Sequence, residues 1–383
     1  MRTLTTALLL AIAGCGSGPP NGPFVDAALL VKAPPPTSQV ALRLLLVGDA
    51  GNPEYARCAL PAGRNAAPLD HCVMQQAAAA GQLVEHSALV LLGDNVYPDG
   101  IPDGEGIAQK RVLDQQLLAA QTSGSALLIV PGNHDWASGR PGGLAAIQRA
   151  RARVLATFQQ PAWALGTTAP WWIEKAGCPG PGTWDSPDGR VRIIGIDTQW
   201  WLHKDEAERR TCGDLAQVEK DAVAGIERAL ATAGDRLTIV ATHHPMASFG
   251  SHRLGSTSPQ DIPSPPYQAL IASLNRALAA HPPHLFVAGH DHDLQVLRGG
   301  PAGVPARVAI VSGAGSKVRD LTAAPPGDQL VFAQGGHLGF MTLDLLTDGR
   351  VLLTVTRSEK ASARQPGGFD QQVFDLSDLL KRK

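Results

Sequence analysis

The chain has 383 residues, of which 17 % are charged and 44 % are hydrophobic, a balance typical of a folded globular protein and not of a disordered one. Its formal net charge of −1 argues against a nucleic-acid-binding surface and against a polybasic membrane patch, so we expect no nucleic-acid partner. The length is enough for one large domain or two ordinary ones.

The first residues have the form of an export signal. Arg2 precedes an apolar run from Leu4 to Ala13, which is too short to span a bilayer but has the length and flanks of a signal-peptide core. The stretch Ile12-Ala13-Gly14-Cys15 resembles the cleavage box of bacterial lipoproteins. This resemblance implies cleavage before Cys15 and attachment of lipid to it, the alternative being an ordinary signal peptide with a chance cysteine.

The following stretch, residues 15–40, is rich in glycine and proline, a composition that forms a tether and not a core. We therefore expect residues 1–14 to be a signal peptide and residues 15–40 to be a tether. The membrane is then a partner through lipidated Cys15. Gly16 is not the aspartate associated with inner-membrane retention, so we expect a cell-envelope lipoprotein at the outer membrane or on the periplasmic face.

Four further cysteines remain once Cys15 is set aside, namely Cys58, Cys72, Cys178 and Cys212. An even number in an exported chain indicates disulfides, and three pairings are possible. We favour Cys58–Cys72 and Cys178–Cys212 because each closes a loop that looks otherwise unsupported. Free thiols are the alternative.

Short apolar runs that end in turn residues predict strands in the first two thirds of the chain. Longer stretches with helical spacing of apolar residues lie between most of them, so strands and helices alternate. The predicted strands are residues 42–47, 87–92, 126–130, 191–196, 237–241 and 285–287. The predicted helices are residues 73–85, 107–121, 144–158, 215–233 and 267–280.

The last third has a different pattern, with short turns and no helices between its strands, which is typical of antiparallel pairing. These predicted strands are residues 307–311, 329–332, 338–343 and 350–356. We expect one domain over residues 41–360 and a C-terminal tail over residues 361–383. Residues 161–188 carry tryptophans among glycines and prolines and are expected to form a long surface excursion.

Residue types that bind metal ions follow five of the predicted strands. In chain order they are Asp49, Asp94 with Tyr97, Asn133, His243, and His290 with His292. In an open α/β sheet, ligands bind at the carboxyl ends of the strands. Each turn taken alone could be a helix cap or a turn former, but five in order argue against coincidence.

The donor types sort into two groups. Asp49, Asp94 and Tyr97 supply hard anionic oxygens, which suit trivalent iron, and a histidine completes this set. The second group suits a divalent ion of zinc, manganese or ferrous type; it consists of Asn133, His243 and His290, with Asp94 shared between the two ions. Two-metal hydrolases clamp the attacking and leaving oxygens between such ions.

The motifs around these residues resemble those of the calcineurin-like metallophosphoesterase superfamily. They are Gly48-Asp49-x-Gly51, Gly93-Asp94-Asn95-x-Tyr97, Gly132-Asn133-His134-Asp135, His243-x-Pro245, Gly289-His290-Asp291-His292 and Ser312-Gly313-Ala314-Gly315. The tyrosine after Asp-Asn narrows the resemblance to the purple acid phosphatases. The resemblance runs from about Leu42 to Val355 and implies an α/β fold, a four-layer αββα sandwich with mixed sheets.

The resemblance also implies a role for each residue. Asp49, Asp94, Tyr97 and His292 would hold Fe(III), and Asp94, Asn133, His243 and His290 would hold a divalent ion (Fe, Zn or Mn). His134 matches a catalytic histidine that contacts the phosphate or protonates the leaving group, and His252 matches a second one. His244 is expected to be structural.

The chain departs from the family pattern in two places. Ala50 stands where the family often has an aromatic residue, which would change the wall of the pocket. The insertion that carries Cys58 and Cys72 follows the first ligand and is expected to restrict access of substrates.

The predicted activity is metal-dependent hydrolysis of phosphate monoesters by an acid phosphatase with a dinuclear Fe(III)–M(II) centre. Two alternatives stay open at this point. One is a phosphodiesterase or nucleotide pyrophosphatase of the same superfamily, because fold and metal site do not settle the substrate. The other is a non-catalytic envelope lipoprotein that binds phosphorylated ligands.

Overall fold

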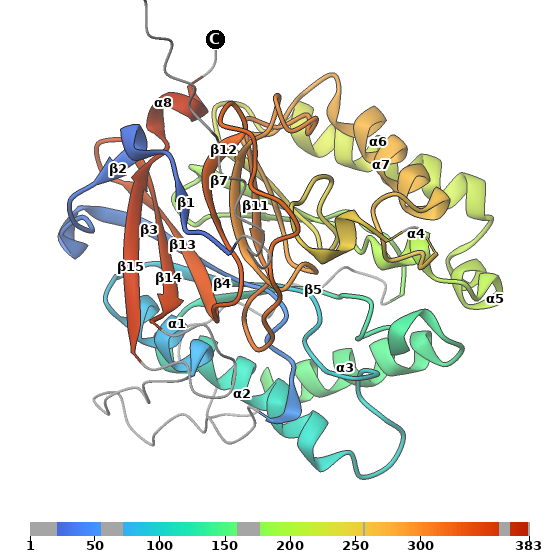
Figure 1. Ribbon diagram of the computed structural model, residues 1–383. Helices are drawn as coiled ribbons and strands as arrows, with labels where there is room; N and C mark the ends of the chain where they lie inside the picture. The colour runs from blue at the N-terminus through green and yellow to red at the C-terminus, as the bar shows by residue number, and fades with distance from the viewer. Residues whose placement is uncertain (1–20, 55–71, 159–176, 256, 360–367, 382–383) are drawn as a thin grey trace, which may run out of the picture.

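The computed structural model describes residues 21–54, 72–158, 177–255, 257–359 and 368–381. Two mixed sheets pack face to face, and helices cover the outer face of each (Figure 1). This arrangement is the predicted four-layer αββα sandwich. The metallophosphoesterase-like fold class is therefore confirmed.

Within the described residues, the first sheet has eight strands. In spatial order they are β1 (Phe24–Val25), β12 (Leu330–Gln334), β10 (Leu294–Arg298), β11 (Val308–Ser312), β9 (Leu285–Ala288), β8 (Leu237–Ala241), β7 (Val191–Gly195) and β6 (Gly182–Asp185). The strands β7, β8, β9 and β11 run parallel to one another. The remaining pairings in this sheet are antiparallel.

The second sheet has seven described strands. They follow the order β2 (Leu30–Val31), β15 (Phe369–Asp375), β14 (Val351–Ser358), β13 (Gly339–Leu346), β3 (Val40–Val47), β4 (Ser87–Leu92) and β5 (Ala126–Val130). The neighbours β3, β4 and β5 are parallel, and β13 joins β3 in the antiparallel sense. Each sheet therefore has a parallel part built from βα units and an antiparallel part.

Packing on both faces explains why the sequences of the parallel strands are unbroken apolar runs. A strand covered on both faces has no side that needs polar residues. In β3, Leu44 and Leu46 point into the layer between the two sheets. Their neighbours Leu45 and Val47 point the other way, toward the helices.

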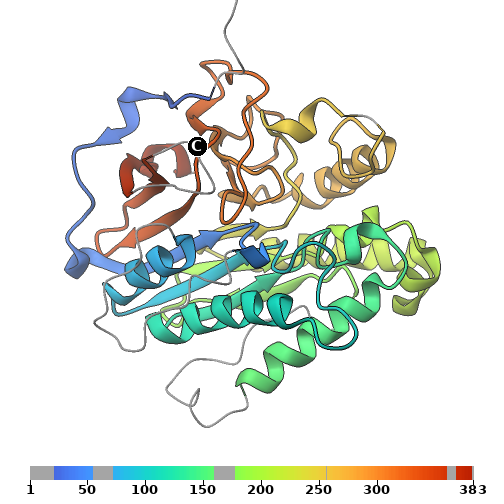
Figure 2. The same cartoon turned by 60° about the horizontal axis from the view of Figure 1, so that its bottom comes forward.

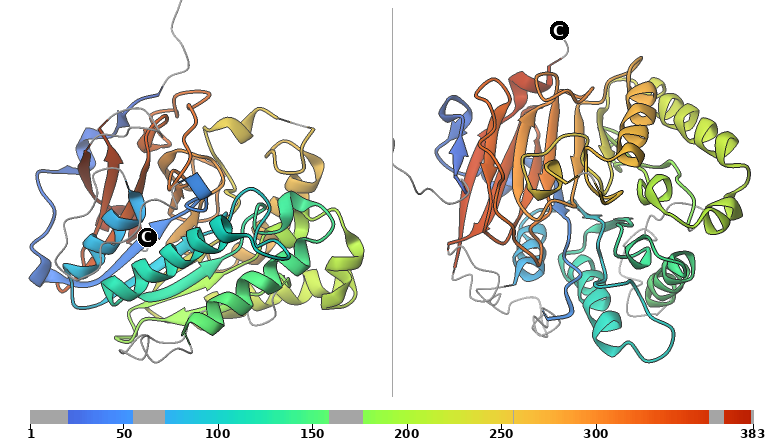
Figure 3. Two further views of the ribbon diagram at one scale, coloured as in Figure 1. Left: turned by 90° about the horizontal axis from the view of Figure 1, so that it is seen from below. Right: turned by 45° about the vertical axis from the view of Figure 1, so that its right-hand side comes forward.

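The outer layers are formed by five longer helices of the described chain. α1 (Val73–Gln82), α2 (Ile107–Ser123) and α3 (Gly143–Phe158) cover the second sheet (Figure 2). α6 (Leu215–Ala231) and α7 (Pro265–Leu278) lie side by side on the first sheet (Figure 3). The short helices are α4 (Gln199–Leu202), α5 (Glu206–Arg209) and α8 (Ser377–Leu380). No helix in this part of the chain has the length and apolar character needed to cross a membrane.

The structure differs from the sequence prediction near both ends of the chain. β1 and β2, which lie in the stretch predicted as a tether, pair with β12 and β15. β15 itself lies in the predicted C-terminal tail and pairs with β14 over its whole length. Two-residue strands carry no periodic pattern, and β15 has polar residues at most positions, so only tertiary pairing reveals them.

Two further predictions about strands were wrong. Gly182–Asp185, inside the predicted surface excursion, forms β6 and pairs with β7. The late strands are not all antiparallel, because β10 returns the chain so that β11 runs parallel to β9. The predicted disulfide Cys178–Cys212 is present. Cys58 and residues 1–20 lie outside the described residues, so the other disulfide and the signal peptide stay predictions.

A buried ion pair joins β3 to β13. The guanidinium of Arg43 donates two hydrogen bonds of 2.7 Å to the carboxylate of Asp344 and a third to the carbonyl of Ala80. The Asp344→Ala substitution leaves this buried cation without its partner, and we expect it to lower the free energy of unfolding by about 3–5 kcal/mol. Urea unfolding of the purified variant measures this loss.

The matched control is Asp114→Ala, which removes the partner of Arg153 in a pair that is 34 % and 41 % exposed. A partly exposed pair contributes about 1 kcal/mol or less. Equal losses in the two variants would contradict the importance of the Arg43 pair.

Candidate metal centre

The parallel strands of both sheets end at the same place, and their turns bring the candidate residues together. The peptide N–H of Asp49 donates to Gly93 (2.9 Å), and that of Gly289 donates to His243 (3.0 Å). These bonds tie the ends of β3, β4, β8 and β9 to one another. The topology therefore delivers Asp49, Asp94, His243 and His290 to a single edge.

Backbone strain concentrates at this edge. Asp49, Asp94 and His290 have positive φ values of 59°, 54° and 72°, a region that residues other than glycine rarely adopt. Such strain costs of order 1–3 kcal/mol per residue and persists where the surroundings enforce it, commonly at functional sites. Gly132 is required for another reason, because a Cβ there would lie 2.4 Å from Asp94 Oδ1.

The first group of predicted ligands is in direct contact. The hydroxyl of Tyr97 donates to Asp49 Oδ1 at 2.9 Å and lies 3.2 Å from His292 Nε2. His292 Nε2 is 3.3 Å from the same Asp49 oxygen. A phenol, a carboxylate and an imidazole thus converge on one point.

The second group converges around His243. Its Nε2 lies 3.1 Å from Asn133 Oδ1, 3.4 Å from Asp94 Oδ1 and 3.2 Å from His290 Nδ1. Nδ1 of His243 faces the carbonyl of Leu92 at 2.8 Å, which fixes the ring and leaves Nε2 directed at the cluster. Asp94 is next to both groups, since it also interacts with Tyr97.

The donor set fits a pair of metal ions. All seven side chains are buried, and the structure brings all seven together. Among the described residues, Asp49 with Asp94 and His243, and His243 with His244 and His290, form groups whose ligating atoms lie within 4.8 Å of one another. Buried carboxylates this close need compensating positive charge, which metal ions would supply.

The electrostatics favour the same conclusion. Burial, reinforced by the neighbouring charge of Asp94, raises the pKa of Asp49 well above its usual value. Burial and the two carboxylates also raise the pKa of Tyr97 well above 10. Burial lowers the pKa of His243, His290 and His292, which favours the neutral imidazole, the form that binds metals.

The two candidate catalytic histidines border the cluster and are less buried. The peptide N–H of His134 donates to Asp94 Oδ1 (2.8 Å), and its Nε2 lies 3.9 Å from Asp94 Oδ2. The ring of His252 stacks on His290 at 4.0 Å between centroids, and its Nδ1 bonds to Asp261. Both are therefore adjacent to the cluster and partly accessible, as a residue that contacts substrate must be.

Two neighbours of the cluster are structural. Both ring nitrogens of His244 have partners at 2.8 Å, the hydroxyl of Thr198 and Oε1 of Gln260, which matches its predicted supporting role. Ala50 is 5 % exposed and packs in the core beneath α1 and α2. Ala50 also lines a small cavity with residues of α1 and α2, and its effect on the wall of the substrate pocket stays a prediction.

Sequence reasoning missed the residues that hold these turns in place. The carboxylate of Asp135 accepts hydrogen bonds from the peptide N–H groups of Gly132, Asn95 and Val96. It thereby joins the turns after β4 and β5. Burial, and the charge of Asp94 next, raise the pKa of Asp135 to about 7. Its place inside the Gly-Asn-His-Asp motif was the only available signal.

Asp197 is a second missed residue and follows β7. Its Oδ2 accepts a bond of 2.8 Å from the indole N–H of Trp136, and its Oδ1 accepts the peptide N–H of Gln199. Burial raises the pKa of Asp197 to about 8. The bond to Trp136 links the turn after β5 to the first sheet.

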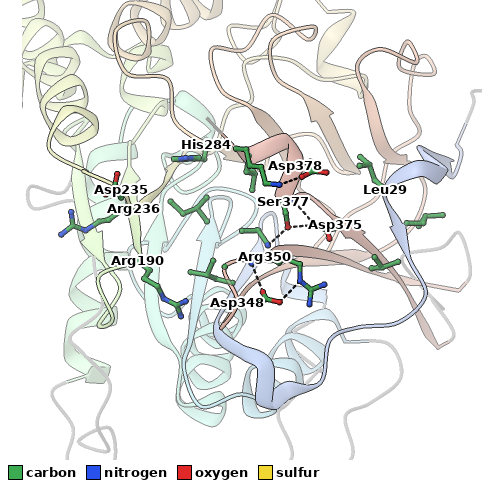
Figure 4. A pocket seen from close by; sticks show the side chains of 18 of the residues that line it. Leu29, Arg190, Asp235, Arg236, His284, Asp348, Arg350, Asp375, Ser377 and Asp378 are labelled. Carbon is green, nitrogen blue, oxygen red and sulfur yellow. Dashed lines mark hydrogen bonds and ion pairs between the residues drawn. The ribbon is translucent and has the colours of Figure 1, made fainter. Parts of the chain in front are cut away.

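A separate cavity of about 1090 Å³ lies at the opposite edge of the sheets, where β7, β8 and β9 begin. Figure 4 shows Arg190, Arg236 and His284 along one side of it. Two ion pairs also lie on its wall, Arg350 with Asp348 and Lys381 with Asp378. We assign no function to this cavity.

Comparison with protein-family models matches residues 42–294 to the calcineurin-like phosphoesterase family. The chain belongs to this family. A search of curated proteins finds no match. As a member of the family, the protein has the fold of a phosphoester hydrolase, and its buried carboxylate and histidine groups are able to hold metal ions.

Solved structures with a similar fold include GAP50, the anchor in the inner membrane complex of Plasmodium, with a TM-score of 0.56 and 17 % identity over 89 % of this chain and 90 % of that one. PhoD has a TM-score of 0.48 and 9 % identity, over 89 % of this chain and 71 % of that one. A protein assigned as a 5'-nucleotidase from Staphylococcus aureus has a TM-score of 0.42 and 13 % identity, over 79 % of this chain and 51 % of that one. At these identities the likeness to GAP50 shows the shared fold alone.

The raised pKa of Asp197 predicts a pH-dependent contribution to stability. Between its unfolded pKa of 3.8 and its folded pKa of about 8, the folded state binds the proton more tightly, so stability falls as pH rises. Asp197→Asn does not titrate. The difference in unfolding free energy, native protein minus variant, should therefore fall by up to about 1.4 kcal/mol per pH unit. Urea unfolding at pH 5, 6 and 7 measures it; a pH-independent difference would contradict the assignment.

Proposed function

We propose that this protein is a metal-dependent acid phosphatase of the purple acid phosphatase type, which hydrolyses phosphate monoesters. The single observation that supports this choice is the hydroxyl of Tyr97, 2.9 Å from Asp49 and 3.2 Å from His292. A phenolate is a hard anionic ligand that favours trivalent iron. Within this family, a tyrosine at this point is the feature that separates the proposed type from other phosphoesterases.

In this proposal Fe(III) would be held by Asp49, Asp94, Tyr97 and His292. A divalent ion, Fe, Zn or Mn, would be held by Asp94, Asn133, His243 and His290. When bound, the two ions neutralise charge on the phosphoryl oxygens and acidify the attacking water. The proposal is supported by the hardness of the first donor set and the imidazole and amide content of the second.

The other residues bind the ester and move protons. His134 stands beside Asp94 with its Nε2 partly accessible, where it can donate a proton to the departing alkoxide. This role requires the imidazolium form, so activity should be highest at acidic pH. His252, stacked on His290, is proposed to help orient the phosphate.

The test is hydrolysis of p-nitrophenyl phosphate from pH 4 to 9, before and after removal of metals by a chelator. We expect metal-dependent release of phosphate with an acidic optimum. His134→Ala should lower kcat by about 10²-fold or more, whereas His86→Ala, which removes an exposed histidine beside Glu85, should leave kcat unchanged.

No metal-dependent hydrolysis at any pH would sink the proposal. Faster hydrolysis of bis(p-nitrophenyl) phosphate than of the monoester would favour a phosphodiesterase of the same family. Tight phosphate binding without turnover would favour the non-catalytic alternative.

We also propose that the protein is exported and anchored to the cell envelope by lipid on Cys15, at the outer membrane or periplasmic face. The support is the sequence Ile12-Ala13-Gly14-Cys15 after an apolar run. Several acyl chains anchor a protein firmly, whereas one does so only marginally. Cys15→Ala should therefore move the protein from the membrane to the soluble fraction on fractionation, with Lys204→Ala, at an exposed position, as the control. An unchanged distribution of Cys15→Ala would refute the anchor.

A further inference from the structure

A lysine that no motif predicted lies against the metal centre. The ammonium group of Lys317 is 3.5 Å from the centroid of the Tyr97 ring, and its side chain is half-buried. A cation over an aromatic face gains modest electrostatic stabilisation, more so when partly desolvated. The position of Lys317 is therefore defined, and a basic side chain lies beside the centre.

The loop that carries Lys317 is attached to the metal-binding turns themselves. Ser316 hydrogen-bonds through its hydroxyl to the carbonyl of Asp49, and the peptide N–H of Gly315 donates to Gly48 at 3.0 Å. Two residues after Lys317, the peptide N–H of Arg319 donates to the carbonyl of His292 at 2.8 Å. Lys317 is thus held between two of the proposed ligands, so its place relative to the centre is part of the fold.

The charge of Lys317 has no dedicated partner in the part of the chain that the structure describes. Within the described residues, the ion pairs within 4 Å do not include Lys317. The carboxylates that attract it most are Asp94 and then Asp49, with the exposed Glu54 a weaker influence. Asp94 and Asp49 are the residues assigned to the metal ions. Once they are neutralised, Lys317 presents an uncompensated positive charge to whatever binds at the centre.

A second cation extends the same edge. Arg319 is exposed, and its guanidinium donates to the hydroxyl of Ser251 at 3.1 Å. Ser251 precedes His252, which borders the centre. Lys317, over the Tyr97 ring, and Arg319, bonded to the residue before His252, therefore both border the cluster.

We propose that Lys317 binds a second phosphoryl group attached to the scissile one, so that the preferred substrates are diphosphates and their monoesters. This inference rests on the proposed function and names its substrate class. Lys317 contacts the ring of Tyr97, whose hydroxyl bonds to Asp49. Its ammonium group can therefore contact only a ligand group that is bound close to the cluster. Lysine is an effective phosphate ligand as a compact point charge. An uncharged leaving group would leave this ammonium without a partner.

The reaction balances with water as the only co-reactant. The water oxygen forms a bond to the phosphorus at the centre, and the bond from that phosphorus to the bridging oxygen breaks. The bridging oxygen keeps the electron pair and departs with the second phosphate. One proton of the water goes to the departing phosphate and the other to solvent. Lys317 keeps its proton and stabilises the charge on the leaving phosphate.

The kinetic test compares pyrophosphate with phenyl phosphate, whose leaving group carries no second phosphate. Lys317→Ala should lower kcat/KM for pyrophosphate about tenfold, mainly by raising KM, and change it less than twofold for phenyl phosphate. Lys317→Arg should recover most of the loss because it keeps the charge. Lys204→Ala, which removes an exposed lysine elsewhere, should affect neither substrate. Equal losses on both substrates, or no loss on pyrophosphate, would overturn the proposal.

A binding measurement separates this inference from the proposed function. Isothermal titration calorimetry of the metal-containing protein would give Kd values for methylenediphosphonate and for phosphate, with metal content measured before and after. Lys317→Ala should weaken methylenediphosphonate about tenfold and phosphate by less than twofold. If the native protein hydrolyses neither substrate, the proposed function fails, and this titration still decides the role of Lys317. An unchanged Kd ratio would refute that role.

Discussion

The structure depends on one constraint, which is that Asp49 and Asp94 are buried side by side at the ends of two parallel strands. Both have left-handed backbone angles, and both are almost fully removed from solvent. Charged carboxylates in such a place are costly unless they are paired. The surrounding imidazoles, phenol and amide offer ligands and hydrogen bonds, and the nearby ammonium group of Lys317 lies over the Tyr97 ring and not in an ion pair with either carboxylate. A pair of cations is the partner that this arrangement fits, and most of the site serves to hold the candidate ligands in place for it.

Around that pair, a set of polar residues maintains the geometry. Asp135 ties the turns after β4 and β5, and Asp197 ties Trp136 to the first sheet. Ser316 connects the late loop to Asp49. None of these residues is a candidate ligand. Each holds in place a turn that carries a candidate ligand or borders the cluster. The strain at the strand ends is therefore supported by hydrogen bonds from both sheets.

The candidate ligand set could be predicted from the sequence because it depends on local features of the chain. A buried parallel strand reads as an apolar run, and the residue after it must lie at the carboxyl edge, so Asp49, Asp94 and His243 could be placed together without coordinates. The supporting residues were not accessible, since the partners of Asp197 and Lys317 are distant in sequence. The same reason explains the missed strands β1, β2 and β15, which exist only through pairing with remote strands.

The most direct test of this account is elemental analysis combined with the visible absorption spectrum of the native protein and of Tyr97→Phe. The account predicts about one iron and one further metal per chain, and a phenolate-to-iron charge-transfer band that colours the native protein. Tyr97→Phe should lose that band while its circular dichroism remains that of the folded protein. A colourless native protein without iron, or a band that survives in Tyr97→Phe, would contradict the claim that this phenol is a ligand of the centre.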